Sequence, residues 1–154
     1  MKKIVSILCA AIICLVAFAG CSGQTDVDLK SVLDEMNSAY DTAGLEKITD
    51  VNDLNTYYQI NPDDVKQFAA EISSSADSPV EVVLVEAKDA TAAQNVTTQL
   101  SNRYNSIYSQ YASYSPDQLD MVKACKVTTD GNFVSMIVSK DAAGMLDIFY
   151  KYVK

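Results

Sequence analysis

The side chains with the most chemical character form a row of tyrosines in the second half of the chain. Tyr104, Tyr108 and Tyr111 are spaced by four and three residues, which places them on one face of a helix, and Tyr114 follows after three more. With Arg103 beside them, they could stack on sugar rings or contact a protein, because tyrosine offers a large rigid surface with a polar tip. The same spacing fits the inward stripe of a core helix, and we favour that interpretation for Tyr104 and Tyr111. Tyr108, Tyr114 and Arg103 then remain as the candidate ligand or partner surface.

Catalytic and metal-binding chemistry has few candidates. The chain contains no histidine, the commonest general base and transition-metal ligand. Cys125 therefore lacks the usual partner of a catalytic cysteine, and we expect it to be a small buried hydrophobe. The paired carboxylates lie near expected helix starts, where acids favour the helix dipole, and they do not match a calcium loop; the pairs are Asp26/Asp28, Asp34/Glu35, Asp63/Asp64 and Asp117/Asp120. The sequence therefore predicts no catalytic residue, no metal site and no cofactor.

The N-terminus has the organisation of an export signal. Lys2 and Lys3 form a short positive region, and a mostly apolar run follows over residues 4–18. That run is too short for a comfortable membrane span but typical of a signal peptide, which we expect to cover residues 1–20.

The residues after the apolar run predict where the signal peptide is cleaved and whether the mature protein is lipidated. Ala19-Gly20-Cys21 resembles a lipobox, in which a cysteine is lipidated and becomes the mature N-terminus, although Phe18 occupies the position where leucine is usual. We expect lipid on Cys21 and a tether over residues 21–27 that holds the protein on the extracytoplasmic face of the cell membrane. The alternative is cleavage after Ala19 at a small-x-small site, which would release a secreted protein.

The balance of charge narrows the range of partners. The chain has 12 Lys and Arg against 20 Asp and Glu, and removal of the signal peptide would take away two lysines and leave a net charge of about −10. An acidic surface repels phosphate backbones, so we expect no nucleic-acid partner. The expected contacts are the membrane, through the lipid on Cys21, and an envelope protein or glycan.

Apolar periodicity predicts a single α+β domain over residues 28–154. An amphipathic N-terminal helix, with Thr25 and Asp28 at its start, is followed by a mixed connector over residues 45–60. The turn dipeptide Asp130-Gly131 predicts a β-hairpin. The expected helices cover residues 25–40, 90–112 and 141 onward, with a short helical turn at 115–117, and the expected strands cover about 67–74, 80–87, 123–129 and 132–139.

A weak internal repeat supports this order of elements. When the chain is shifted by 52 residues, residues 82–90 align with residues 134–142, and both segments run from an apolar strand through Lys-Asp-Ala into a helix. We therefore expect an antiparallel sheet of three to four strands in a β-β-α, β-β-α order, with an additional N-terminal helix. Residues 67–112 and 123–153 should then superpose, with both repeat helices on one face of the sheet and the N-terminal helix on the other.

Several segments resemble a known family. They are the turn Tyr58-Gln59-Ile60-Asn61, the acid-led strand of residues 81–87 that ends in Lys88-Asp89, the long helix, and Gly131-Asn132-Phe133 before the C-terminal helix. Together with the N-terminal signal they resemble lipoproteins of low-GC Gram-positive anaerobes that carry the domain of unknown function 4358. The resemblance implies an envelope location and this order of elements, and it implies no catalytic residues.

These observations favour one class of function. We expect a lipid-anchored extracytoplasmic protein that is not an enzyme and acts as a binding or interaction module at the cell envelope. The alternative is an acid-based hydrolase of a cell-wall glycan or another extracellular polymer, which would require two carboxylates about 5–10 Å apart across a cleft.

Overall fold

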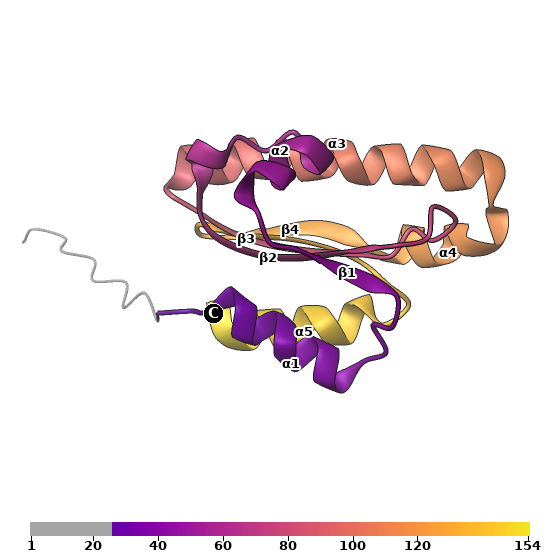
Figure 1. Cartoon of the computed structure of the whole chain (residues 1–154), viewed down its shortest axis with the longest axis horizontal. Helices are drawn as coiled ribbons and strands as arrows, with labels where there is room; N and C mark the ends of the chain where they lie inside the picture. The colour runs from indigo at the N-terminus through magenta and orange to yellow at the C-terminus, as the bar shows by residue number, and fades with distance from the viewer. Residues whose placement is uncertain (1–25) are drawn as a thin grey trace, which may run out of the picture.

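Five antiparallel strands form one sheet through the middle of the molecule, in the order β1-β2-β3-β5-β4 (Figure 1). The structure is a computed structural model that describes residues 26–154. The expected signal peptide, Cys21 and the tether up to Thr25 lie outside the described residues. The strands are β1 (Leu45–Ile48), β2 (Val65–Ser73), β3 (Glu81–Ala87), β4 (Lys126–Asp130) and β5 (Phe133–Val138).

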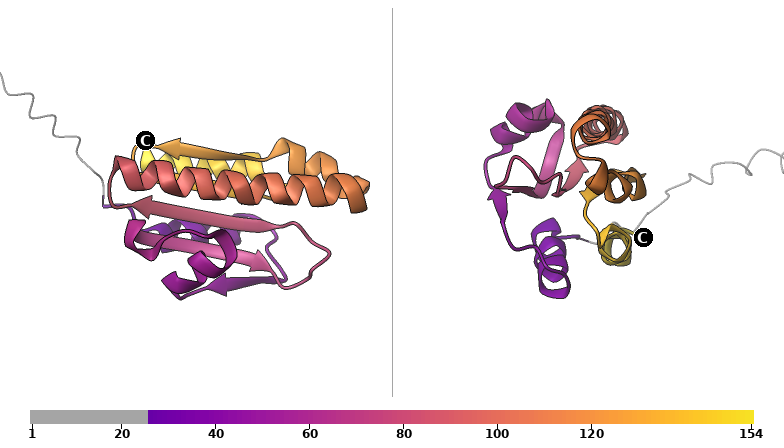
Figure 2. Two further views of the ribbon diagram at one scale, coloured as in Figure 1. Left: turned by 90° about the horizontal axis from the view of Figure 1, so that it is seen from above. Right: turned by 90° about the vertical axis from the view of Figure 1, so that its right-hand side faces the viewer.

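Helices cover both faces of this sheet. Figure 1 shows α2 and α3 on one side of the strands and α1 and α5 on the other, and Figure 2 shows the same two layers from the end. The helical elements are α1 (Leu29–Ala39), α2 (Val51–Tyr58), the 3-10 turn η1 (Pro62–Asp64), α3 (Ala90–Tyr114), α4 (Pro116–Ala124) and α5 (Ala142–Val153). Among residues 26–154, no helix has the length and apolar character needed to cross a membrane.

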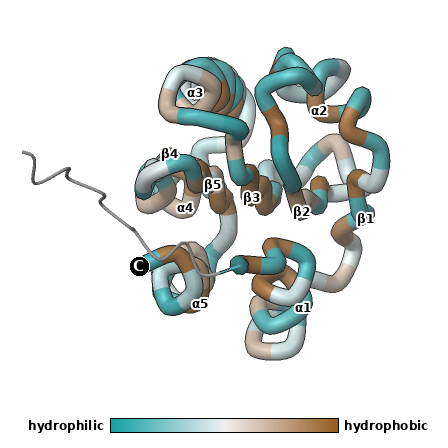
Figure 3. Tube along the Cα trace, turned by 90° about the vertical axis from the view of Figure 1, so that its left-hand side faces the viewer, coloured by the Kyte–Doolittle hydropathy of each residue, from teal (hydrophilic) through white to brown (hydrophobic). Residues whose placement is uncertain are grey.

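The central strands β3 and β5 are apolar on both sides because each side faces a helical layer. In β3, Val83 and Val85 belong to the core beneath α2 and α3, whereas Val82 and Leu84 belong to the core beneath α1 and α5. Figure 3 shows the resulting pattern, with hydrophobic strands lying between helices whose outer sides are polar (Figure 3).

The predicted class and element order are confirmed, and the strand number is not. The fold is α+β with an antiparallel sheet, an N-terminal helix and two β-β-α segments, but the sheet has five strands instead of three to four. The additional strand, β1, lies in the segment expected to be a connector. It is a short edge strand whose four residues pair with β2 from Leu45↔Ser73 to Ile48↔Ala70.

The expected superposition of the two β-β-α segments is wrong, because their helices lie on opposite faces. Ala92 and Val96 of α3 pack in one core, and Met145 and Phe149 of α5 pack in the other. A rotation that superposes the hairpin β2-β3 on β4-β5 therefore carries α3 to the wrong side of the sheet. The long α3 and α2 already fill their face, and α5 buries the apolar residues on the opposite side of β5, such as Ile137, beside α1.

Several element boundaries also differ from the prediction. Helix α1 begins after Asp28, whose side chain accepts hydrogen bonds from the Lys30 amide at 3.0 Å and from the Ser31 hydroxyl at 2.7 Å. The expected turn at 115–117 is the start of the nine-residue helix α4, so the next strand begins at Lys126 instead of residue 123. The hairpin at Asp130-Gly131 is confirmed, with Gly131 at φ 55°.

Candidate functional site

The tyrosine row lies on α3, which begins at Ala90 because the Asp89 carboxylate accepts a hydrogen bond from the Ala92 amide at 2.9 Å. The predicted inward position of Tyr111 is confirmed, because it is buried in line with Leu100 and Ile107. Tyr104 packs against the same core, and its hydroxyl donates to the carbonyl of Val122 at 3.0 Å. These tyrosines therefore hold α3 and α4 on the sheet.

Tyr108 and Tyr114 are exposed, at 39% and 84%, but they do not form one surface. Six residues along an α-helix correspond to a rotation of roughly 240°, so the two rings face different directions. Tyr114 is the last residue of α3, whereas it was expected beyond the helix end.

Arg103 pairs with a carboxylate inside the fold. Its Nε donates to Glu81 Oε2 at 3.1 Å and its Nη2 donates to Glu81 Oε1. The Glu81 side chain is only 3% exposed and that of Arg103 is 33% exposed. The hydrogen bonds to Glu81 raise the pKa of Arg103 further above its ordinary value. The pair therefore ties α3 to the beginning of β3.

Tyr58, the last residue of α2, completes this buried polar group. The guanidinium carbon of Arg103 lies 5.9 Å from the centre of the Tyr58 ring. Within residues 26–154 no group meets good hydrogen-bond geometry with the buried Tyr58 hydroxyl, although the Glu81 carboxylate interacts with it. Burial, and after it the negative charge of Glu81, raises the pKa of Tyr58 far above its ordinary value, so this phenol stays neutral.

Glu86 in β3 is a second buried carboxylate, and it lies close in space to the first residues of the described chain. Glu86 accepts hydrogen bonds from Lys66 Nζ at 2.6 Å and from Gln67 Nε2 at 2.5 Å. The same Gln67 amide also donates to the Val27 carbonyl at 2.6 Å, and its Oε1 accepts from the Leu29 amide at 3.1 Å. This network joins β2 and β3 to the beginning of α1.

Glu71 is the third buried carboxylate. It accepts a hydrogen bond from Asn37 Nδ2 at 2.8 Å and lies 3.8 Å from Lys47 Nζ. The three buried glutamates therefore all have polar partners that hold one element against another, and the sequence analysis did not single them out. The available signal was their position in strands that are otherwise mostly apolar.

The other residues considered for chemistry have structural surroundings. Cys125 is buried, its Sγ donates to the Met121 carbonyl at 3.1 Å, and burial raises the pKa of its thiol. Glu35 accepts hydrogen bonds from Lys151 at 2.9 Å and from the Tyr152 hydroxyl. Both contacts lower the pKa of Glu35, and the hydrogen bond from Tyr152 has the larger effect. Among residues 26–154, no cluster of three or more potential metal ligands is found.

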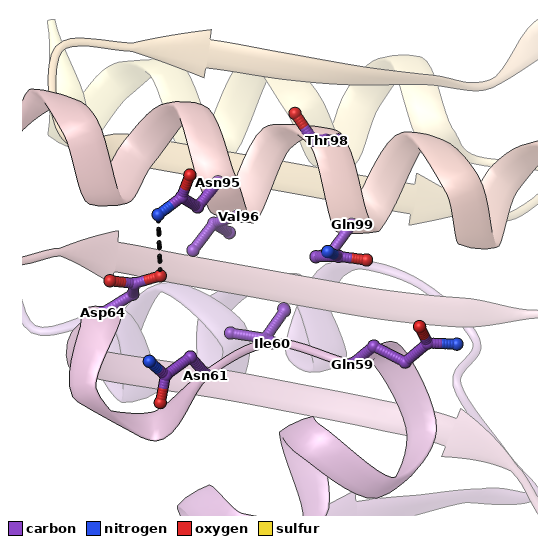
Figure 4. Close-up of a pocket in the computed structure, with 8 residues that line it drawn as sticks. All are labelled: Gln59, Ile60, Asn61, Asp64, Asn95, Val96, Thr98 and Gln99. Atoms are coloured by element: carbon purple, nitrogen blue, oxygen red, sulfur yellow. Dashed lines mark hydrogen bonds between the residues drawn. The ribbon is translucent and has the colours of Figure 1, made fainter.

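A polar groove between α3 and the turn after α2 is the best candidate for a ligand site (Figure 4). It has a volume of about 310 Å³, at the lower end of the range for small-molecule sites. Its lining residues are Gln59, Ile60, Asn61, Asp64, Asn95, Val96, Thr98 and Gln99.

The turn that forms one wall of the groove has an unusual backbone. Gln59 occupies the left-handed region at φ 58° and ψ 23°, which glycine or asparagine usually adopts at a helix end. Its amide donates to the Asn55 carbonyl at 2.9 Å, and the amide of the buried Ile60 donates to the Leu54 carbonyl at 3.2 Å. A side chain in this region costs about 1 kcal/mol relative to glycine. A strained non-glycine residue in the wall of a cavity is the type of feature that accompanies functional sites.

Four carboxamide side chains line the groove, and two of them form no hydrogen bond with the described residues. Asn95 Nδ2 donates to Asp64 Oδ2 at 3.1 Å, and Asn61 Oδ1 accepts from the Asp63 amide. In the described part of the chain, the side chains of Gln59 and Gln99 form no hydrogen bond. A carboxamide offers two donors and an acceptor. The groove can therefore bind a neutral, hydrogen-bonding ligand, and its lining holds one carboxylate, Asp64.

Comparison with known proteins identifies the family. A family profile, the domain of unknown function DUF4358, matches residues 38–139, about two thirds of the chain. The matched segment runs from the last turn of α1 to the end of β5 and contains the whole groove. Searches of curated proteins and of solved structures found no match. The chain therefore belongs to the family defined by DUF4358.

Proposed function

We propose that this protein is a lipid-anchored extracytoplasmic binding module, attached to the cell membrane through Cys21, and that the polar groove between α3 and the Gln59–Asp64 turn holds its ligand. The observation that carries the proposal is the pair of unused carboxamides, Gln59 and Gln99, in one groove with a strained backbone at Gln59. The fold has no need of a glutamine at φ 58°, where glycine would be less strained.

The chemistry of the groove selects a neutral ligand rich in hydroxyl or amide groups, such as an envelope glycan. Asn61 and Asn95 add further polar side chains beside the two glutamines. Asp64 and the acidic net charge of the protein disfavour polyanionic polymers. Planar carboxamides bind sugar hydroxyls by donating and accepting at the same time.

The distribution of carboxylates supports a binding module over an acid-based hydrolase. Four cavities lined by described residues each contain a single carboxylate: Asp64, Asp41, Glu81 or Asp147. Of these, Glu81 is engaged by Arg103. Two-carboxylate glycoside hydrolysis needs a second acid facing the first.

The test is a binding assay with the full lipoprotein in detergent and envelope glycan fragments. Gln59→Gly removes a carboxamide while its backbone suits φ 58°, and Gln99→Ala removes the other from a helix face. Each variant should weaken binding about tenfold, the equivalent of one or two lost hydrogen bonds, without lowering the melting temperature. Tyr108→Ala and Tyr114→Ala are matched controls, because both rings are exposed on the same helix.

The controls also discriminate between the two candidate surfaces. If Tyr108→Ala or Tyr114→Ala abolishes binding and the glutamine variants do not, the ligand binds the aromatic surface and the groove assignment fails. Release of reducing ends from the glycan would support the hydrolase instead. Separately, Cys21→Ser should leave the precursor unprocessed and without lipid, whereas normal secretion of a soluble protein would show that cleavage follows Ala19.

A further inference from the structure

A second cavity lies at the end of the sheet opposite the start of α1. It has a volume of about 350 Å³ and is formed by three loops that are far apart in sequence: the α1–β1 loop, the β2–β3 loop and the β5–α5 loop. Figure 1 shows these loops together at the end of the molecule remote from the C-terminus (Figure 1). Its polar lining is dominated by hydroxyl groups, which come from Thr42, Ser73, Ser74, Ser75, Ser78 and Ser139.

Four of these serines use their oxygen as a hydrogen-bond acceptor within the loops. Ser73 Oγ accepts from the Ser75 amide at 3.1 Å, and Ser75 Oγ accepts from the Asp77 amide at 3.3 Å. Ser78 and Ser139 accept from the amides two residues further on, at 3.4 and 3.1 Å. Within residues 26–154, none of these four hydroxyls donates a hydrogen bond, so their O–H groups remain available to a ligand.

Two charged side chains complete the lining. Lys140 is exposed and has no carboxylate within ion-pair distance among the described residues, so its ammonium adds three further donors. Asp41 is the opposing charge, and one of its oxygens accepts from the Ala43 amide at 3.1 Å. The lining therefore offers four hydroxyl donors and one ammonium group that forms no ion pair among the described residues, together with a single carboxylate.

We propose that this serine and lysine cavity binds a small oxyanion group, either a phosphate or a carboxylate, with Lys140 supplying the charge and the four serine hydroxyls supplying neutral donors. An anion can use these donors together, because each of its oxygens can accept several hydrogen bonds. This site is independent of the polar groove, with which it shares no residue.

The donors favour phosphate over carboxylate. They approach from two sides: Ser73 at the end of β2 and Ser75 and Ser78 on the β2–β3 loop form one side, and Ser139 and Lys140 on the β5–α5 loop form the other. Three tetrahedrally arranged oxygens and a charge near −2 suit such a distribution better than one planar, singly charged group. Asp41 limits the affinity, because it places a like charge beside the anion.

The experiment is an amide-resolved NMR titration of the full chain in detergent micelles at constant ionic strength, with inorganic phosphate and, separately, with acetate. Binding should shift the amide resonances of residues 73–78 and 139–140. Lys140→Gln should weaken phosphate binding about tenfold, as expected for the loss of a charged donor. Asp41→Asn should strengthen it several-fold, because it removes the repulsion within the cavity.

A matched control is Lys126→Gln, since Lys126 is also an exposed lysine but does not line this cavity. It should leave the phosphate affinity unchanged. Glycerol 3-phosphate and N-acetyl-alanyl-alanine then distinguish a phosphate ester from a peptide carboxylate as the source of the group. The proposal is overturned if neither anion shifts these resonances at about 50 mM, a concentration that reveals even weak sites. It is also overturned if Lys140→Gln and Lys126→Gln change the affinity equally.

Discussion

Replacement of Arg103 by methionine tests whether the Glu81–Arg103 pair holds α3 on the sheet. Methionine keeps most of the length of the arginine side chain and removes its charge. Glu81, with 3% of its side chain exposed, would then be a buried carboxylate without its guanidinium partner. Removal of one member of a buried ion pair typically costs about 3–5 kcal/mol, because the remaining charge is uncompensated.

The partial exposure of Arg103 places the expected loss at the lower end of that range. With 33% of the Arg103 side chain exposed, water can reach the site in the variant and solvate part of the Glu81 charge. We expect the free energy of unfolding to fall by about 3 kcal/mol. For a domain of this size that loss corresponds to a decrease in melting temperature of roughly 10 °C.

The assay is urea unfolding of four proteins, followed by circular dichroism: the parent, Arg103→Met, Glu81→Gln and the double variant. The double variant should recover at least about 1.5 kcal/mol relative to Arg103→Met alone, because the unpaired charge is gone. Lys151→Met is the control, since Lys151 pairs with Glu35 at the surface and 62% of its side chain is exposed. Loss of such a surface pair should cost less than about 1 kcal/mol.

Two results would refute this reasoning. If Arg103→Met costs less than about 1 kcal/mol, the pair behaves like a surface ion pair and does not hold the helix. If the double variant is as unstable as the sum of the single variants, the cost comes from lost packing of the arginine stem and not from the buried charge.

Three further predictions use the same unfolding measurement. Tyr58→Phe should raise the free energy of unfolding by about 1 kcal/mol, because it removes a buried hydroxyl without a hydrogen bond of good geometry; a decrease would mean that Glu81 accepts a hydrogen bond from this hydroxyl. Tyr111→Ala should lower it by about 3–5 kcal/mol, as other large-to-small core changes do, whereas the exposed Tyr114→Ala should change it by less than about 0.5 kcal/mol. Gly144→Ala would place a Cβ atom 1.9 Å from the hydroxyl oxygen of Tyr40, at the end of α1. We therefore expect the free energy of unfolding to fall by about 1–3 kcal/mol, and a smaller residue in place of Tyr40 should restore part of that loss.

Most elements of the fold could be predicted because their apolar patterns are local. The inward arc on α3 and the hairpin at Asp130-Gly131 both depend on residues close together in sequence. Strand β1 could not be predicted in this way. It has four residues, of which Glu46 and Lys47 are charged and exposed, and it forms by pairing with one edge of β2. Such a short edge strand carries no alternation long enough to detect.

The face on which α5 packs also lies beyond local patterns. Both β-β-α segments have the same strand-to-helix signal, with Lys88-Asp89-Ala90 in one and Lys140-Asp141-Ala142 in the other. That signal starts a helix but does not say to which side of the sheet it turns. The side depends on which apolar faces of the strands remain uncovered by the other helices, and this is a property of the whole domain.

The polar groove could not be predicted from local sequence patterns either. The turn Tyr58-Gln59-Ile60-Asn61 was recognised as a family feature, but its neighbours across the groove, Asn95 and Gln99, belong to a helix more than thirty residues away. Scattered polar residues on a helix suggest a solvated surface. The sequence predicts Arg103 at the surface, whereas in the fold Glu81 engages it.

If the protein is anchored through Cys21 as proposed, the contacts of Gln67 have a mechanical consequence. The chain enters the described domain at Val27, and the side chain of Gln67 hydrogen-bonds both the Val27 carbonyl and the Leu29 amide, as a neighbouring strand would. A force that pulls on the chain before Val27 would load these two bonds together and pass into β2, which pairs with β1 and β3 on its two sides. Traction on the anchor would therefore reach the sheet before it could unwind α1 from its first turn.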